Sequence, residues 1–192
     1  MIRQLKLWRD NRGAAAAEFA LVAPVMLMVL YGMFDLGHGQ YTRAMLEGAI
    51  DKASRRATIE GATVAGIDGE VTTAIRQIAP GATVTFSRTT YSDFADVGMP
   101  EDYDDVDNDG SCNNNEPYED ANGNGTYDLD RGKTGNGGAR DAVLYKVNVS
   151  YKRIMPIGSL IGQSNITSLN ATTVLRNQPF GIQQYVETKN CP

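Results

Sequence analysis

The residues of this chain that could do chemistry are concentrated in one acidic segment, residues 93–130. The segment holds 13 Asp and Glu residues and no Lys, Arg or His. Carboxylates at this density repel one another, so the segment is either disordered or neutralised by bound cations. Hard oxygen ligands suit a hard cation, and no Cys–His cluster points to zinc. The composition therefore predicts a cation site in this segment.

The first half of the acidic segment matches in full the calcium-loop template D-x-[DN]-x-[DN]-G-x5-E. The residues at its ligand positions are Asp105, Asp107, Asp109, Ser111, Asn113 and Glu116. In this template the aspartates supply side-chain oxygens, the seventh residue its carbonyl and the last a bidentate carboxylate, and Gly110 allows the sharp turn. We predict that this loop binds Ca²⁺.

A second run follows at once and matches only the start of the template. Its candidate ligands are Asp120, Asn122, Asn124 and Asp128. Its twelfth residue is Arg131, which cannot ligate a cation, so Asp128 or Asp130 would have to close a shorter loop. The flanks lack convincing helices, which argues against an EF-hand domain. We predict one or two Ca²⁺ ions in a structural role. The alternative is a solvated acidic insertion with a glycine-rich, flexible exit over residues 132–138.

The N-terminus reads as a membrane anchor. Four basic residues lead into an apolar run of 21 residues, 14–34, and one bilayer crossing needs about 20. The basic leader places the N-terminus in the cytoplasm, and Asp35 ends the run on the far side. We predict a single pass through the bacterial inner membrane with a periplasmic C-terminal domain. Cleavage as an ordinary signal peptide near Gly37-His38-Gly39 stays open.

Glu18 is the informative residue of this anchor. A charged side chain costs about 2.5–3.5 kcal/mol at the bilayer centre and less near an interface. Glu18 lies one turn inside the helix, so in a lone subunit it can reach the headgroups. The sharper hypothesis is that its carboxylate pairs with a positive group on another subunit.

The order of Gly13, Ala14, Glu18 and Phe19 resembles the processing site of type IV pilin-like proteins. Together with Pro24 and a softer likeness over residues 175–180, it is similar to the TadE-like family, the minor pseudopilins of tight-adherence (Flp-type) pilus systems. The resemblance implies a prepilin peptidase that cuts after Gly13. It also implies pairing of Glu18 with the new Ala14 amine of a neighbour, and a role in pilus assembly among other pilins or pseudopilins.

The rest of the chain predicts an α+β fold in which a long N-terminal membrane-spanning helix packs on a small antiparallel sheet, as in pilins. The helix continues through residues 40–59 with an apolar stripe formed by Tyr41, Met45, Ala49, Ala53 and Ala57. A short helix is expected over residues 66–79. Strands with alternating apolar residues are expected over 83–89, 143–150 and 167–176.

Five segments follow from these patterns: a prepilin leader, a transmembrane helix, a part with two helices and the first strand, the acidic Gly/Asn-rich insertion, and the C-terminal strands and tail. They span residues 1–13, 14–35, 36–91, 92–141 and 142–192. Both cysteines, Cys112 and Cys191, fall on the exported side. A disulfide is expected in an oxidising periplasm, and two separate thiols are the alternative.

Charge and motifs narrow the function further. The net charge is −5, and without the leader the remaining 14 basic and 22 acidic residues give −8, which argues against nucleic-acid binding. The single histidine, His38, sits at the membrane exit, and no phosphate loop, nucleophile elbow or metalloprotease motif is found, so no enzyme is predicted. The leading hypothesis is a minor pseudopilin. The alternatives are an uncleaved membrane-anchored calcium-binding adhesion module and, least supported, an anchored enzyme.

Overall fold

The computed structural model describes residues 13–57, 63–155, 158–159, 162, 164–177 and 185–192. Residues 1–12 of the predicted leader lie outside the described residues. The chain divides into two compact units, residues 1–41 with 152–167 and residues 42–151 with 168–192. The predicted fold class, a long N-terminal helix packed on antiparallel sheet in an α+β protein, is confirmed.

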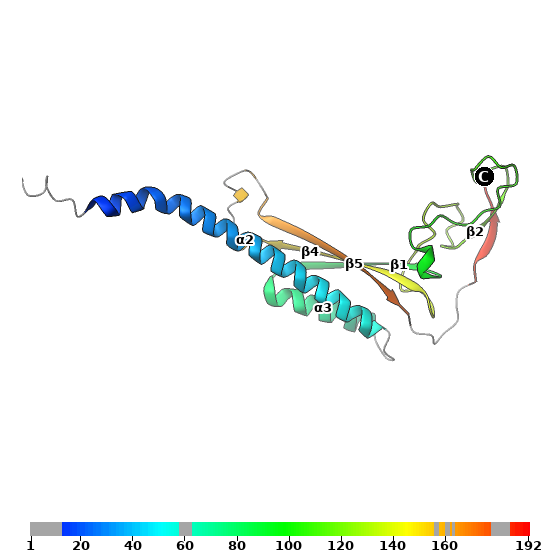
Figure 1. Cartoon of the computed structure of the whole chain (residues 1–192). Helices are drawn as coiled ribbons and strands as arrows, with labels where there is room; N and C mark the ends of the chain where they lie inside the picture. The colour runs from blue at the N-terminus through cyan, green and yellow to red at the C-terminus, as the bar shows by residue number, and fades with distance from the viewer. Residues whose placement is uncertain (1–12, 58–62, 156–157, 160–161, 163, 178–184) are drawn as a thin grey trace, which may run out of the picture. The chain divides into compact units, whose positions relative to one another are not determined.

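Helix α2 is continuous over 44 residues, Ala14–Ala57, and is the blue-to-cyan ribbon of Figure 1. Its first part, in the first unit, keeps its large apolar side chains uncovered. Their exposed fractions range from 40% for Tyr31 to 79% for Leu21. Among the described residues, α2 is the one helix long and apolar enough to cross a membrane. An exposed apolar helix near the N-terminus is consistent with a single membrane anchor or a signal sequence.

A four-stranded sheet with the order β3-β1-β4-β5 forms the second layer (Figure 1). Its strands are β1 (Thr83–Tyr91), β3 (Lys133–Thr134), β4 (Ala142–Lys152) and β5 (Ile166–Arg176). Strand β1 is antiparallel to both of its neighbours, and Phe86 lies opposite Val147. The alternating apolar residues of β4 face inward. Those residues are Val143, Tyr145, Val147 and Val149, each at most 1% exposed.

The core of the second unit lies where α2 and the short helix α3 (Val64–Ile78) cover the sheet. Thr63 caps α3, because its hydroxyl accepts a hydrogen bond from the Gly66 N–H at 3.2 Å. The buried face of α3 consists of Ile67, Val71 and Ile75. Their spacing of four residues puts these side chains on one face of the helix, and they share one hydrophobic core with the inward-facing residues of β4.

The predicted apolar stripe of the long helix was displaced by one residue in its first part, whereas Ala53 is buried as predicted. The buried residues are Thr42, Leu46, Ile50 and Ala53, whereas Tyr41 is 57% exposed. Leu46 and Ile50 are larger than the alanines of the predicted stripe, and burying them removes more apolar surface from water. The face of the helix that carries the bulkier apolar side chains is therefore the buried one. Ala49 and Ala57 are partly buried and pack against the core.

One polar cluster is enclosed between α3 and the sheet. The Tyr145 hydroxyl donates to the Asp68 carboxylate at 2.6 Å, and the Arg88 guanidinium forms an ion pair with the same carboxylate. Arg88 also lies 4.6 Å from the centre of the Tyr145 ring. Burial and the hydrogen bond to Asp68 raise the pKa of Tyr145 far above its usual range, so its hydroxyl stays protonated as a donor.

The acidic insertion is folded around a second, two-stranded sheet. Strand β2 (Pro117–Asp120) pairs antiparallel with β6 (Glu187–Asn190) near the C-terminus, and a short 3-10 helix, η2 (Phe94–Asp96), precedes both. Tyr118 of β2 is 2% exposed. The glycine-rich stretch predicted as a flexible exit contains β3 and a turn in which Gly138 N–H donates to Asp141 at 2.6 Å.

Candidate functional site

The first calcium-template loop closes on its own aspartates. One carboxylate oxygen from each of Asp105, Asp107 and Asp109 lies within 4.8 Å of the others, a spacing that could hold a metal ion. The Asp109 N–H donates to Asp105 at 3.1 Å, and the Gly110 N–H donates to the other Asp105 oxygen at 3.0 Å. Gly110 has φ +78°, so the turn needs a residue without a Cβ penalty.

Two further predicted ligands enter the same loop. The Glu116 carboxylate accepts from Val106 N–H at 2.6 Å and from Asn113 N–H at 3.3 Å, and Glu116 is 3% exposed. Asn113 donates its amide to Asp109 at 2.7 Å, while its Oδ1 is buried and has no hydrogen-bond partner. A cation bound among the three carboxylates would satisfy this buried acceptor. The residues of this loop therefore fit Ca²⁺ chemically.

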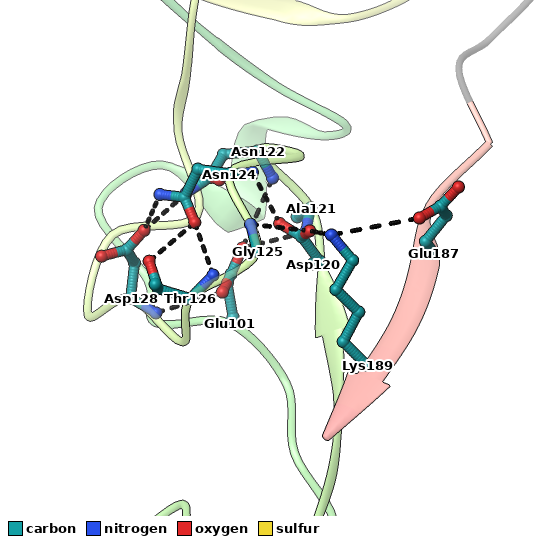
Figure 2. A network of polar contacts seen from close by, with 10 residues as sticks. All are labelled: Glu101, Asp120, Ala121, Asn122, Asn124, Gly125, Thr126, Asp128, Glu187 and Lys189. Atoms are coloured by element: carbon teal, nitrogen blue, oxygen red, sulfur yellow. Dashed lines mark hydrogen bonds and ion pairs between the residues drawn. The ribbon is translucent and has the colours of Figure 1, made fainter. Parts of the chain in front are cut away.

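The second loop brings its four candidate ligands together as well (Figure 2). The Asn124 N–H donates to Asp120 at 3.0 Å, and the Asn122 and Asn124 amides donate to Asp128 at 2.8 and 2.5 Å. Asp120 is buried and pairs with Lys189 of β6 at 2.5 Å. Burial would raise the pKa of Asp120, but the Lys189 ammonium and the Gly125 N–H lower it, so its carboxylate is ionised.

Sequence reasoning missed Glu101 as part of the second loop. Glu101 is 1% exposed, and its carboxylate accepts from the N–H groups of Ala121 at 2.9 Å and Asp128 at 3.1 Å. In Figure 2 its side chain reaches into the loop among Asp120, Asn122 and Asp128. The signal in the sequence was the spacing, since Glu101 precedes Asp105 by four residues, as Glu116 precedes Asp120.

The predicted disulfide between Cys112 and Cys191 is present. It joins the first loop to the residue that follows β6, and the Cys191 N–H donates to the Glu116 carbonyl at 2.8 Å. Cys191 is 3% exposed. The chain end is therefore held beside both loops, by the disulfide at one and by Lys189 at the other.

The predicted processing site lies at the start of α2. Gly13 directly precedes Ala14, the first helical residue, and Glu18 and Phe19 are both exposed one turn further on. At the other end of the apolar run, Asp35 forms an ion pair with Arg153 within the same unit. Ion pairing of Asp35 fits the predicted end of the apolar segment.

The chain combines an N-terminal helix whose apolar first half is exposed with helix-on-sheet packing in the second unit, an α+β arrangement. Residues 13–55 match the model of the TadE-like protein family. The match does not extend to the softer C-terminal likeness at residues 175–180, of which 178–180 lie outside the described residues. No curated protein and no solved structure matches the chain.

Proposed function

We propose that this protein is a minor pseudopilin of a tight-adherence pilus system, cut by a prepilin peptidase after Gly13. The observation that carries the proposal is the family match over residues 13–55 on a helix whose apolar first half is uncovered. The protein would cross the inner membrane once, with its C-terminal domain in the periplasm. It would assemble with other pilins or pseudopilins, in the filament or in its assembly complex, and its role would be structural rather than catalytic.

The exposed Glu18 supports assembly through the helix. No partner within the described chain neutralises its carboxylate. In a membrane such a group is costly unless a positive charge meets it. The proposed partner is the Ala14 amine of a neighbouring subunit, which exists only after cleavage. This arrangement would set the axial register between subunits.

Mass spectrometry of the protein from its native membranes tests the processing step. We expect the mature chain to begin at Ala14, and we expect Gly13→Val to leave Met1 in place because the added side chain blocks the peptidase. Gly37→Val is the matched control and should not change processing. A mature chain that begins at Gln40 would indicate signal-peptide cleavage, and an intact Met1 in piliated cells would leave only the uncleaved adhesion module.

We further infer that the two loops bind Ca²⁺ and that the ions hold the acidic insertion in its folded form. The buried, unpartnered Asn113 Oδ1 beside three clustered carboxylates supports this proposal most directly. Extracellular calcium sites bind at about 10⁻⁴–10⁻³ M, so the ions would be structural rather than sensing.

Calcium should stabilise the full-length protein in detergent micelles. At 10 mM Ca²⁺, an affinity in this range corresponds to about 1.4–2.7 kcal/mol per site. Thermal unfolding followed by circular dichroism in Ca²⁺ and in chelator measures the difference. Asp107→Asn should reduce the gain, and Asp93→Asn, outside both loops, should not. Identical melting curves with and without chelator would contradict structural calcium.

A further inference from the structure

The two acidic loops repeat each other at a spacing of 15 residues, and their internal hydrogen bonds match. Segments 101–111 and 116–126 share the pattern E-x3-D-x-[DN]-x-[DN]-G. The N–H of the fifth loop residue donates to the first aspartate at 3.1 Å in one loop and 3.0 Å in the other. The glycine N–H donates to the other oxygen of that aspartate at 3.0 Å in both. The loops therefore share one local conformation.

The segments that lead into the loops pair with each other about a local two-fold axis. Tyr103 and Tyr118 form an antiparallel bridge at its centre. Two main-chain hydrogen bonds flank the bridge, from Asp104 N–H to the Pro117 carbonyl at 2.9 Å and from Glu119 N–H to the Asp102 carbonyl at 2.8 Å. A shift of 15 residues exchanges the two bonds. The loops are thus related as the halves of an isologous pair.

The two glutamates that open these segments exchange loops. Glu116 precedes the second loop, but its carboxylate accepts hydrogen bonds in the first loop, from the N–H groups of Val106, Asp107 and Asn113. Glu101 precedes the first loop, but its carboxylate accepts hydrogen bonds in the second, from the N–H groups of Ala121, Asn122 and Asp128. The second set of donors lies 15 residues after the first. Glu101 therefore has in the second loop the place that Glu116 has in the first.

Buried groups without partners point to a ligand in both loops. Within the described residues, no lysine or arginine forms an ion pair with Glu101 or Glu116, which are 1% and 3% exposed. Tyr118 is 2% exposed and its hydroxyl has no hydrogen-bond partner. In the first loop the unpartnered atom is Asn113 Oδ1. A buried carboxylate without a counter-charge is strongly unfavourable. A bound cation would supply that charge, and its water would supply the missing hydrogen-bond partners.

We propose that Glu101 is the acidic ligand that completes the second loop, and that the two loops bind Ca²⁺ as a coupled pair through their exchanged glutamates. The proposal rests on the proposed calcium binding and adds a ligand and a coupling to it. Arg131 at the twelfth position then does not prevent ion binding, because Glu101 supplies the carboxylate that the template requires. Coupling follows because an ion that fixes one glutamate also fixes the strand leading into the other loop.

Calorimetric titration of the full-length protein with CaCl₂ in detergent micelles tests the exchange. Asp105→Asn leaves only the second loop competent, and Asp120→Asn leaves only the first. In the Asp105→Asn background, adding Glu101→Gln should weaken Ca²⁺ binding at least about tenfold, while Glu116→Gln should change it less than about twofold. In the Asp120→Asn background the effects should be reversed, so that Glu116→Gln weakens Ca²⁺ binding and Glu101→Gln changes it little. Wild-type protein should bind two ions, the second about fivefold more tightly or better.

The controls separate this inference from the calcium proposal itself. Glu119→Gln removes an exposed carboxylate from β2 and should leave the Ca²⁺ affinities of both loops unchanged. If Glu101→Gln does not fold, Glu101→Asp replaces it, because aspartate keeps the negative charge on a shorter side chain that places it farther from the second loop. Calcium binding in which Glu101 matters only to the first loop, or to neither, overturns the exchange and leaves the calcium proposal intact. A wild-type protein that binds no Ca²⁺ overturns both.

Discussion

Asp68→Ala is expected to lower the free energy of unfolding by about 3–5 kcal/mol, because it leaves the Arg88 guanidinium enclosed without its counter-charge. The Arg88 side chain is only 12% exposed, and Asp68 is its ion-pair partner beneath the sheet. The same carboxylate accepts from the Tyr145 hydroxyl at 2.6 Å, so the substitution also removes the acceptor of a fully buried donor. Both losses act in the core of the second unit.

Chemical denaturation of the full-length protein in detergent measures this effect. Glu70→Ala is the matched control, because Glu70 is on the same helix and pairs with Arg56 at the surface, where the Arg56 side chain is 52% exposed. It should cost less than about 1 kcal/mol. Combining Asp68→Leu with Arg88→Leu should recover part of the loss, since no unpaired charge then remains. Equal effects of Asp68→Ala and Glu70→Ala would show that the cluster is not enclosed.

Local patterns in the sequence predicted the layers of this fold but not the rotation of its long helix. Strand β4 was predictable because alternation with a period of two has only two phases, and Val143 and Val147 select one of them. The helix stripe was misplaced in its first part because residues spaced strictly four apart drift by about 40° per step around the axis. The error brought Tyr41 into the predicted stripe and left out Leu46 and Ile50, which the core buries.

The candidate site was predictable where its candidate ligands follow one another in the sequence, and not where folding brings them together. The first loop follows one template from Asp105 to Glu116, and the structure brings these residues together. Glu101 precedes the second loop in the chain, and the bridge between Tyr103 and Tyr118 helps to bring it there. A template that is read forward from Asp120 cannot find a candidate ligand that an earlier segment of the chain supplies.

The position of the C-terminal tail was likewise beyond local pattern reading. Strand β6 consists of Glu187, Thr188, Lys189 and Asn190, which have no apolar alternation. It is a strand because β2 offers it a free edge and because the disulfide holds it there. The pairing of the cysteines, in contrast, followed from their number and their predicted exported position.

Replacing Cys112 and Cys191 together by serine should lower the free energy of unfolding by about 2–5 kcal/mol. The two residues are 79 apart in the sequence, and closing a loop of that length restricts the unfolded chain by about 4.5 kcal/mol in the chain-entropy model. The loss should fall on the insertion, because β6 and the first loop share this link. Denaturation of the oxidised wild type and of the double variant measures it, and limited proteolysis should release the tail from the variant first.

The same double variant connects the disulfide to the proposed ion sites. Cys112 is the eighth residue of the first loop, and Lys189, two residues before Cys191, pairs with Asp120 of the second. Freeing the tail should therefore weaken Ca²⁺ binding at both loops, because their bound conformations would have to be ordered during binding. Saturating Ca²⁺ should in turn recover part of the lost stability. A double variant as stable as the wild type, with an equally protected tail, would mean that β6 is held by its strand pairing alone.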